Sequence, residues 1–152
     1  MNENKILKNV DDKWEVTTNR YVAYIDIMGF KDLVARASHD EIYGLMKRIE
    51  YSKQVNENIN WDGNNLGLVK TTTYSDSIMI YSKDDSVEAL HSFICTVSGI
   101  TYDLFCELIP HKGAISFGIM TLDTISSIFF GQPLIDAYLL QEELSFYGIA
   151  VH

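Results

Sequence analysis

Two aspartates occupy positions where a folded chain would hold them close to each other. Asp26 ends an apolar, β-prone run in "YVAYIDIMGFKDLV", residues 21–34, and Asp76 lies between the β-prone runs "LGLVKTTTY" and "SIMIYS". Burying an unpaired carboxylate costs several kcal/mol, so we expect Asp26 to reach solvent or to meet a cation. Mg²⁺ and Mn²⁺ prefer oxygen ligands and typically take one or two protein carboxylates together with substrate phosphates. The pair therefore predicts a site for divalent cations.

The residues directly after Asp26 predict an anion site beside the metal. The stretch "IMGFKD" turns from a strand pattern into a helix pattern. The free backbone amides of Gly29, Phe30 and Lys31 would then point at an anion docked at the helix start, so that metal and polyphosphate share one cleft. The structural alternative is that Asp26 caps the helix and Asp76 lies in an ordinary turn.

The elements that must position these residues alternate between strand and helix patterns. Strands are expected over residues 20–28, 66–74, 77–82, 112–122, 127–133 and 147–152, and helices over 30–37, 38–56, 85–109 and 134–144. "SHDE" predicts a capping box, and "NINWDGNN" has the composition of a turn.

The order of these elements predicts an α+β fold of the ferredoxin-like or palm type, an antiparallel-rich sheet with helices packed on it. Strand alternation places Val22, Tyr24 and Asp26 on one face of the first strand. In this fold the first strand lies beside the hairpin, which brings Asp26 close to Asp76.

Length and composition set limits on the class of protein. A chain of 152 residues suits one domain, here 18–152 after a polar lead at 1–17. The net charge is −9, without the basic stripe that nucleic acids require. No apolar run approaches a membrane span and the N-terminus lacks a signal peptide core, so we expect a cytoplasmic protein with no membrane partner.

Cysteine and histidine usage agrees with this location. Cys95 and Cys106 fall in one expected helix, about 16 Å apart along its axis, so they could not form a disulfide and are expected to be two buried thiols. The four histidines lack the spacing of metal ligands, so we do not expect zinc.

Several motifs, in the same order, resemble the catalytic domain of the class III nucleotide cyclases. "YIDIMGF" is similar to that family's aromatic-x-Asp-Ile-x-Gly-Phe strand, and "TTYSDSIMI" to its hairpin with a second metal aspartate. "KGAISFG" and "GQPLIDAYLLQEEL" resemble the Arg-Gly-Ala-Ile-Ser-x-Gly strand and the Gly-x-Pro-Leu-Ile-Glu/Asp-Ala-Tyr helix start of the pyrimidine cyclases of bacterial Pycsar anti-phage systems. The resemblance runs from about residue 20 to the end of the chain.

The resemblance implies a site and a reaction. Asp26, Asp76 and the backbone of Ile27 would hold two Mn²⁺ or Mg²⁺ ions per site, and a nucleoside triphosphate would be converted to a 3′,5′-cyclic nucleotide and pyrophosphate by intramolecular phosphoryl transfer. It also implies a homodimer with two-fold related sites at the subunit interface. The cyclic pyrimidine nucleotide would activate a separate effector during phage infection. Family members usually continue beyond the last strand, so we expect residues completing the sheet or the site to follow residue 152.

The chain departs from the family at positions that read the base and support the transition state. Thr72 stands where adenylate cyclases have an adenine-reading lysine, and Ile135 and Leu139 stand where a later helix supplies Asn and Arg. Adenine reading by that lysine and support by that pair are therefore excluded. Lys112, in the family's arginine position, is our candidate for the missing cation; the alternative is an exposed lysine at a strand start.

Two residues of the hairpin could shape the base pocket. Thr72 and Tyr74 share a strand face with Asp76 by alternation, although cross-strand packing alone would also explain them. Tyr138 and Asp136 would flank the same cleft, or serve only as core and capping residues. We expect UTP to be cyclised best and CTP second, the resemblance placing UTP first.

Three other readings remain open at this stage. The chain could be a cytidylate cyclase, a catalytically dead cyclase-like domain that binds a nucleotide or only dimerises, or a plain structural domain. A diguanylate cyclase is disfavoured, because "TYSDSI" is not a Gly-Gly-Asp/Glu-Glu-Phe hairpin.

Overall fold

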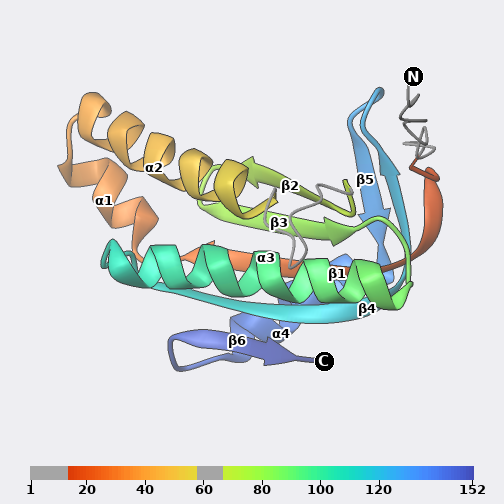
Figure 1. The fold of residues 1–152 in the computed structure, drawn as a ribbon. Coiled ribbons are helices and arrows are strands. Elements are labelled where there is room, and N and C mark those ends of the chain that lie inside the picture. The colour runs from red at the N-terminus through yellow and green to blue at the C-terminus, as the bar shows by residue number, and fades with distance from the viewer. Residues whose placement is uncertain (1–13, 58–66) are drawn as a thin grey trace, which may run out of the picture.

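Within residues 14–57 and 67–152, which the computed structural model describes, six strands form one sheet (Figure 1). Its order is β2-β3-β1-β4-β5, and β6 pairs with β4 in parallel. The strands are β1 Thr17–Ile27, β2 Val69–Tyr74, β3 Ser77–Ser82, β4 His111–Asp123, β5 Ile128–Gly131 and β6 Gly148–Val151. The helices are α1 Phe30–Arg36, α2 His39–Glu57, α3 Val87–Cys106 and α4 Gln132–Glu143. The predicted α+β fold, with the first strand beside the hairpin, is confirmed.

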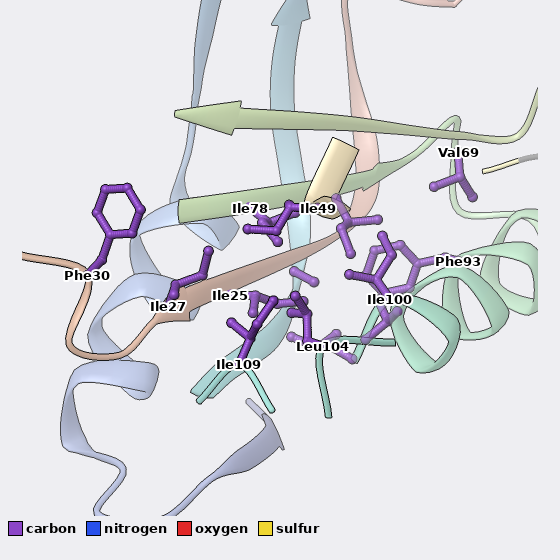
Figure 2. Close-up of a cluster of buried hydrophobic side chains, with 14 of the residues drawn as sticks. Ile25, Ile27, Phe30, Ile49, Val69, Ile78, Phe93, Ile100, Leu104 and Ile109 are labelled. Atoms are coloured by element: carbon purple, nitrogen blue, oxygen red, sulfur yellow. The ribbon is translucent and has the colours of Figure 1, made fainter. Parts of the chain in front are cut away.

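β1 lies in the middle of the sheet and alternates as predicted. Its buried residues Ala23, Ile25 and Ile27 pack with residues of α2 and α3 in the main core (Figure 2). Val22 belongs to a second buried cluster, which Leu134 of α4 packs against. The sheet thus has α2 and α3 on one face and α4 on the other, and the Asp26 face is the α4 face (Figure 1).

Local signals fix the helix starts. Ser38 and Glu41 form the predicted capping box: the Ser38 amide donates to Glu41 Oε2 at 2.7 Å, and the Glu41 amide donates to Ser38 Oγ at 3.3 Å. Ser86 caps α3 by accepting the Ala89 amide at 3.2 Å.

α3 ends earlier than expected and does not bury all of its apolar residues. It ends at Cys106, because Leu108 adopts a left-handed conformation with φ 56° and the Ile109 amide returns to the Leu104 carbonyl at 2.8 Å. Val87 and Ile94 recur at helical spacing with Val97, Ile100 and Leu104, but are exposed. The buried stripe consists of Ala89, Phe93, Thr96, Val97, Ile100 and Leu104.

Two further expectations on α3 need correction. Cys95 and Cys106 form no disulfide, as predicted, but neither is buried: Cys95 is half-buried and Cys106 is exposed. α3 also has the length and composition of a membrane span, which the sequence was not expected to contain. Phe93, Ile100 and Leu104 bury one side of it against the sheet, so core packing accounts for part of its apolar composition.

The first strand begins earlier than predicted. β1 starts at Thr17 instead of residue 20, and Trp14 packs before it, donating from Nε1 to the Gly67 carbonyl at 3.1 Å. Most of the predicted polar lead and the turn predicted from "NINWDGNN" lie outside the described residues.

Candidate metal and nucleotide site

The structure brings the segments that carry Asp26 and Asp76 together at one end of the sheet. Asp26 pairs with Ser77 in the β1–β3 register, so it lies beside the residue that follows Asp76. The Ile27 amide donates to the Asp76 carbonyl at 2.8 Å, which joins the end of β1 to the β2–β3 turn. In that turn Ser75 has φ 54°.

The charge of Asp26 is destabilised in the metal-free chain. Partial burial raises the pKa of Asp26 above its usual range, and the charge of Asp76 raises it further. Lys112 acts in the opposite direction, and Glu142 adds to the increase. A divalent cation between the two carboxylates would relieve this repulsion.

The donor set fits a hard cation. Asp26 and Asp76 offer carboxylate oxygens, and Ile27, whose side chain is buried in the core, can offer only its backbone carbonyl. Among the described residues no cluster of three or more histidine, cysteine or carboxylate side chains forms a metal site. Substrate phosphates and water would have to complete the coordination, which is the usual pattern for Mg²⁺.

The turn after Asp26 leaves space for an anion. Gly29 has φ 73° and ψ 9°, a left-handed conformation that favours glycine, and nothing lies within 4 Å of the place where a Cβ would be. α1 begins at Phe30, whose ring is buried in the core while Lys31 is exposed. The first amides of a helix have no intrahelical acceptor. Backbone amides, not the Phe30 side chain, are therefore what this turn can offer to a phosphate.

Lys112 lies beside Asp26 on the neighbouring strand. The two residues pair in the β1–β4 register, and the positive charge of Lys112 lowers the pKa of Asp26. Its Nζ lies 3.4 Å from the Leu144 carbonyl and 3.5 Å from the Glu142 carbonyl, at the C-terminal end of α4. The residue is near the site, and its role in the transition state stays a prediction.

The two base-pocket candidates lie on the Asp26 face. In the β2–β3 register Thr72 pairs with Met79 and Tyr74 pairs with Ser77, which itself pairs with Asp26. Tyr74 is 77% exposed, so in a single chain its ring is not covered. Both residues therefore share a sheet face with Asp26, whereas Asp76 itself lies in the β2–β3 turn. The reading of a base by Thr72 and Tyr74 stays a prediction.

α4 packs on the Asp26 face of the sheet and carries exposed apolar side chains. Ile135 and Leu139 are 51% and 53% exposed. The Gln132 side chain donates from Nε2 to Asp136 Oδ1 at 2.8 Å, so Asp136 has a partner in the first turn of its own helix. The Tyr138 ring lies edge-on to the Tyr24 ring, with 5.4 Å between their centroids.

Sequence reasoning missed a contact next to the aspartates. The Tyr24 hydroxyl lies 2.5 Å from Ser77 Oγ. Burial is the main cause that raises the pKa of Tyr24, and the charges of Asp26 and Asp76 contribute to the same increase. The alternation that places Tyr24 on the Asp26 face was the available signal, but only the strand register shows that its hydroxyl reaches Ser77.

A hollow of about 610 Å³ lies between α1, α2 and residues 107–110 and reaches the turn after β1, because Ile27 and Gly29 also line it. Its lining includes Met28, Gly29 and Leu45 but neither Asp26 nor Asp76. The carboxylate pair therefore lies outside this hollow.

Comparison with known proteins identifies the fold. No family model matches the sequence, and no curated protein matches it. Among solved structures, the guanylyl cyclase Cya2 superimposes with a TM-score of 0.61 at 12% identity, covering 83% of this chain and 70% of that one. A class III adenylyl cyclase-like ATP-binding protein from Pseudomonas aeruginosa superimposes with a TM-score of 0.53 at 14% identity. That match covers 90% of this chain and 33% of the other. The chain has the class III nucleotide cyclase fold.

Proposed function

We propose that this domain is a cytoplasmic pyrimidine nucleotide cyclase that converts UTP to 3′,5′-cyclic UMP and pyrophosphate. The observation that carries the proposal is the meeting of the Asp26 and Asp76 segments at one end of a sheet with the class III cyclase fold. The repulsion that raises the pKa of Asp26 supports a cation between them.

In this proposal some residues bind the metal ions and the phosphates, and Lys112 stabilises negative charge. Asp26, Asp76 and the Ile27 carbonyl would hold Mn²⁺ or Mg²⁺, two ions per site. When bound, the ions lower the pKa of the attacking ribose hydroxyl and neutralise the phosphates. The amides after Gly29 would receive phosphate oxygens, and Lys112 would add positive charge close to Asp26.

The base preference rests on the hairpin and on the sequence resemblance. Thr72 cannot make the charged contact of a lysine, and Tyr74 on the same face would narrow the pocket to one ring. A site that hydrogen-bonds a small base rejects a mismatched one, because its buried polar groups are left unpaired. We place UTP first and CTP second.

Two copies of the chain would complete the site. Ile135 and Leu139 present exposed apolar surface on the helix that packs on the Asp26 face, and a two-fold related partner would cover it. The cyclic product would act on a separate effector, as in the Pycsar anti-phage systems that the sequence resembles.

Incubation with each of the four nucleoside triphosphates and Mn²⁺ or Mg²⁺, followed by mass spectrometry of the products, tests the activity. We expect cyclic UMP as the main product. Comparable or faster product from ATP would overturn the pyrimidine preference and leave the cyclase in place, while faster product from CTP would make the chain a cytidylate cyclase.

Asp76→Ala should abolish turnover without unfolding the domain, because a turn aspartate contributes little to the core. Pyrophosphate release and the circular dichroism spectrum are the two measurements. Turnover by this variant close to that of the parent would remove Asp76 from the metal site.

A nucleotide-binding domain without catalysis is the second candidate. Ile135 and Leu139 favour it, because they replace the Asn and Arg that the family uses on this helix, and one structural neighbour is described as an ATP-binding protein. A melting temperature that rises with nucleotide and metal, with no pyrophosphate released, would support it.

A further inference from the structure

A hydroxyl contact links the two strands that carry the aspartates. Tyr24 lies two residues before Asp26 on β1, and Ser77 directly follows Asp76 at the start of β3. Their hydroxyl oxygens are 2.5 Å apart. The contact therefore joins the segments immediately next to both carboxylates.

Packing fixes both partners of this contact. Ser77 is 8% exposed and pairs with Asp26 on one side and Tyr74 on the other. The Tyr24 ring is held edge-on against Tyr138 of α4, with 5.4 Å between the centroids. Neither hydroxyl can move far without disturbing a neighbouring strand or helix.

We propose that the Tyr24–Ser77 hydroxyl pair positions Asp26 and Asp76 for binding a divalent cation. The inference rests on the proposed metal site. Two like charges push the segments apart when no cation is present. The β1–β3 pairing, the Ile27 amide bond to the Asp76 carbonyl and the Tyr24–Ser77 contact oppose this, and of these only the last is made by side chains. Holding ligands in place before the ion arrives reduces the cost of binding.

Binding of Mn²⁺ alone, measured by electron paramagnetic resonance of the free ion in the presence of the full chain, tests the proposal without relying on turnover. Tyr24→Phe and Ser77→Ala should each weaken Mn²⁺ binding about tenfold, at the lower end of the usual effect of groups that orient metal ligands. The double variant should be little weaker than either single variant, because both changes remove the same contact. Ser77→Thr keeps the hydroxyl and should restore most of the affinity.

Tyr81→Phe is the matched control. Tyr81 lies on the same sheet face, is fully buried, and its hydroxyl has no hydrogen-bond partner among the described residues. Its variant should bind Mn²⁺ as the parent does. A Tyr24→Phe or Ser77→Ala chain that melts lower but keeps the parent's Mn²⁺ affinity would overturn the positioning role.

Asp26→Asn separates this inference from the function on which it rests. Loss of Mn²⁺ binding in Asp26→Asn, with parent affinity in Tyr24→Phe and Ser77→Ala, would overturn the positioning role and leave the metal site. Parent affinity in Asp26→Asn would overturn the metal site itself. If Tyr24→Phe fails to fold, the Mn²⁺ affinities of Ser77→Ala and Ser77→Thr test the positioning role: equal affinities would overturn it.

Discussion

At the scale of single residues, the ionised carboxylate of Asp26 destabilises the folded domain unless a cation neutralises its charge. It is partly buried, the charge of Asp76 raises its pKa, and among the described residues Lys112 is the cation that lowers it. A carboxyl whose pKa is raised by folding loses stabilisation as the pH rises through that folded pKa. The metal-free domain is therefore weakened at neutral pH by the residue that we assign to the metal.

Asp26→Asn should raise the melting temperature of the metal-free domain at neutral pH, because an amide cannot ionise. The gain should shrink as the pH falls through the ordinary aspartate pKa of about 3.9, because below it the parent carboxyl is protonated in both folded and unfolded chains. Thermal unfolding with a chelator present, over a pH series, measures it. Added Mn²⁺ should stabilise only the parent; equal stabilisation of both chains would contradict the assignment.

Tyr74→Ala should relax the discrimination against purines. The ring is exposed at the site face in a single chain, so removing it enlarges the pocket without opening the core. The measurement is the ratio of kcat/KM for UTP to that for ATP, with Tyr43→Ala as the control, since Tyr43 is an exposed tyrosine of α2 on the other face. An unchanged ratio would mean that another residue closes the site.

The sequence was sufficient to predict the aspartate pair and insufficient to predict the Tyr24–Ser77 contact. Asp26 and Asp76 interrupt apolar runs, so the sequence alone marks them as candidate metal ligands. The hydroxyl contact depends on which residues face each other across β1 and β3, and register follows from the whole sheet.

At the scale of elements, a buried polar network sets how α2 packs on α3. Ser52 Oγ donates to Asp103 Oδ2 at 2.7 Å, and Asn56 Nδ2 donates to the same oxygen at 2.9 Å. Gly99 lets the helices approach closely, because a Cβ there would lie 1.7 Å from Asn56 Oδ1.

Gly99→Ala should therefore lower the free energy of unfolding by about 1–3 kcal/mol, the usual effect of overpacking. The Asn56 side chain cannot move away easily from the added methyl group, because it is buried and hydrogen-bonded to Asp103. Gly44→Ala is the control: the nearest atom to its Cβ would be Arg48 Nη1 at 3.9 Å, so this change within α2 should stabilise by about 0.5–1 kcal/mol. Urea unfolding of both variants measures the effects, and the same sign in both would contradict this account.

Helix starts were more predictable than helix faces. The Ser38–Glu41 capping box is a local signal and was found. Helical spacing alone groups Val87 and Ile94 with Val97, yet both are exposed. This helix is apolar on several sides, so its buried side is determined by its packing on the sheet.

At the scale of the whole molecule, α4 carries exposed apolar surface and packs on the sheet face that also carries Asp26. Ile135 and Leu139 are exposed, and Tyr138 from the same helix contacts Tyr24 beside Asp26. A partner chain related by a two-fold axis would cover this surface and approach the site at the same time. Assembly and activity should therefore fail together.

Leu139→Glu should convert a dimer into a folded monomer that releases no pyrophosphate, because a carboxylate buried at the interface would be left unpaired. Light scattering after size-exclusion chromatography gives the mass, and circular dichroism reports the fold. Val87→Glu is the matched control: it introduces the same charge at an exposed apolar position of α3, on the opposite face of the sheet, and should leave both mass and activity unchanged. A dimeric Leu139→Glu chain would place the interface elsewhere, and a monomeric parent with full activity would show that one chain completes the site alone.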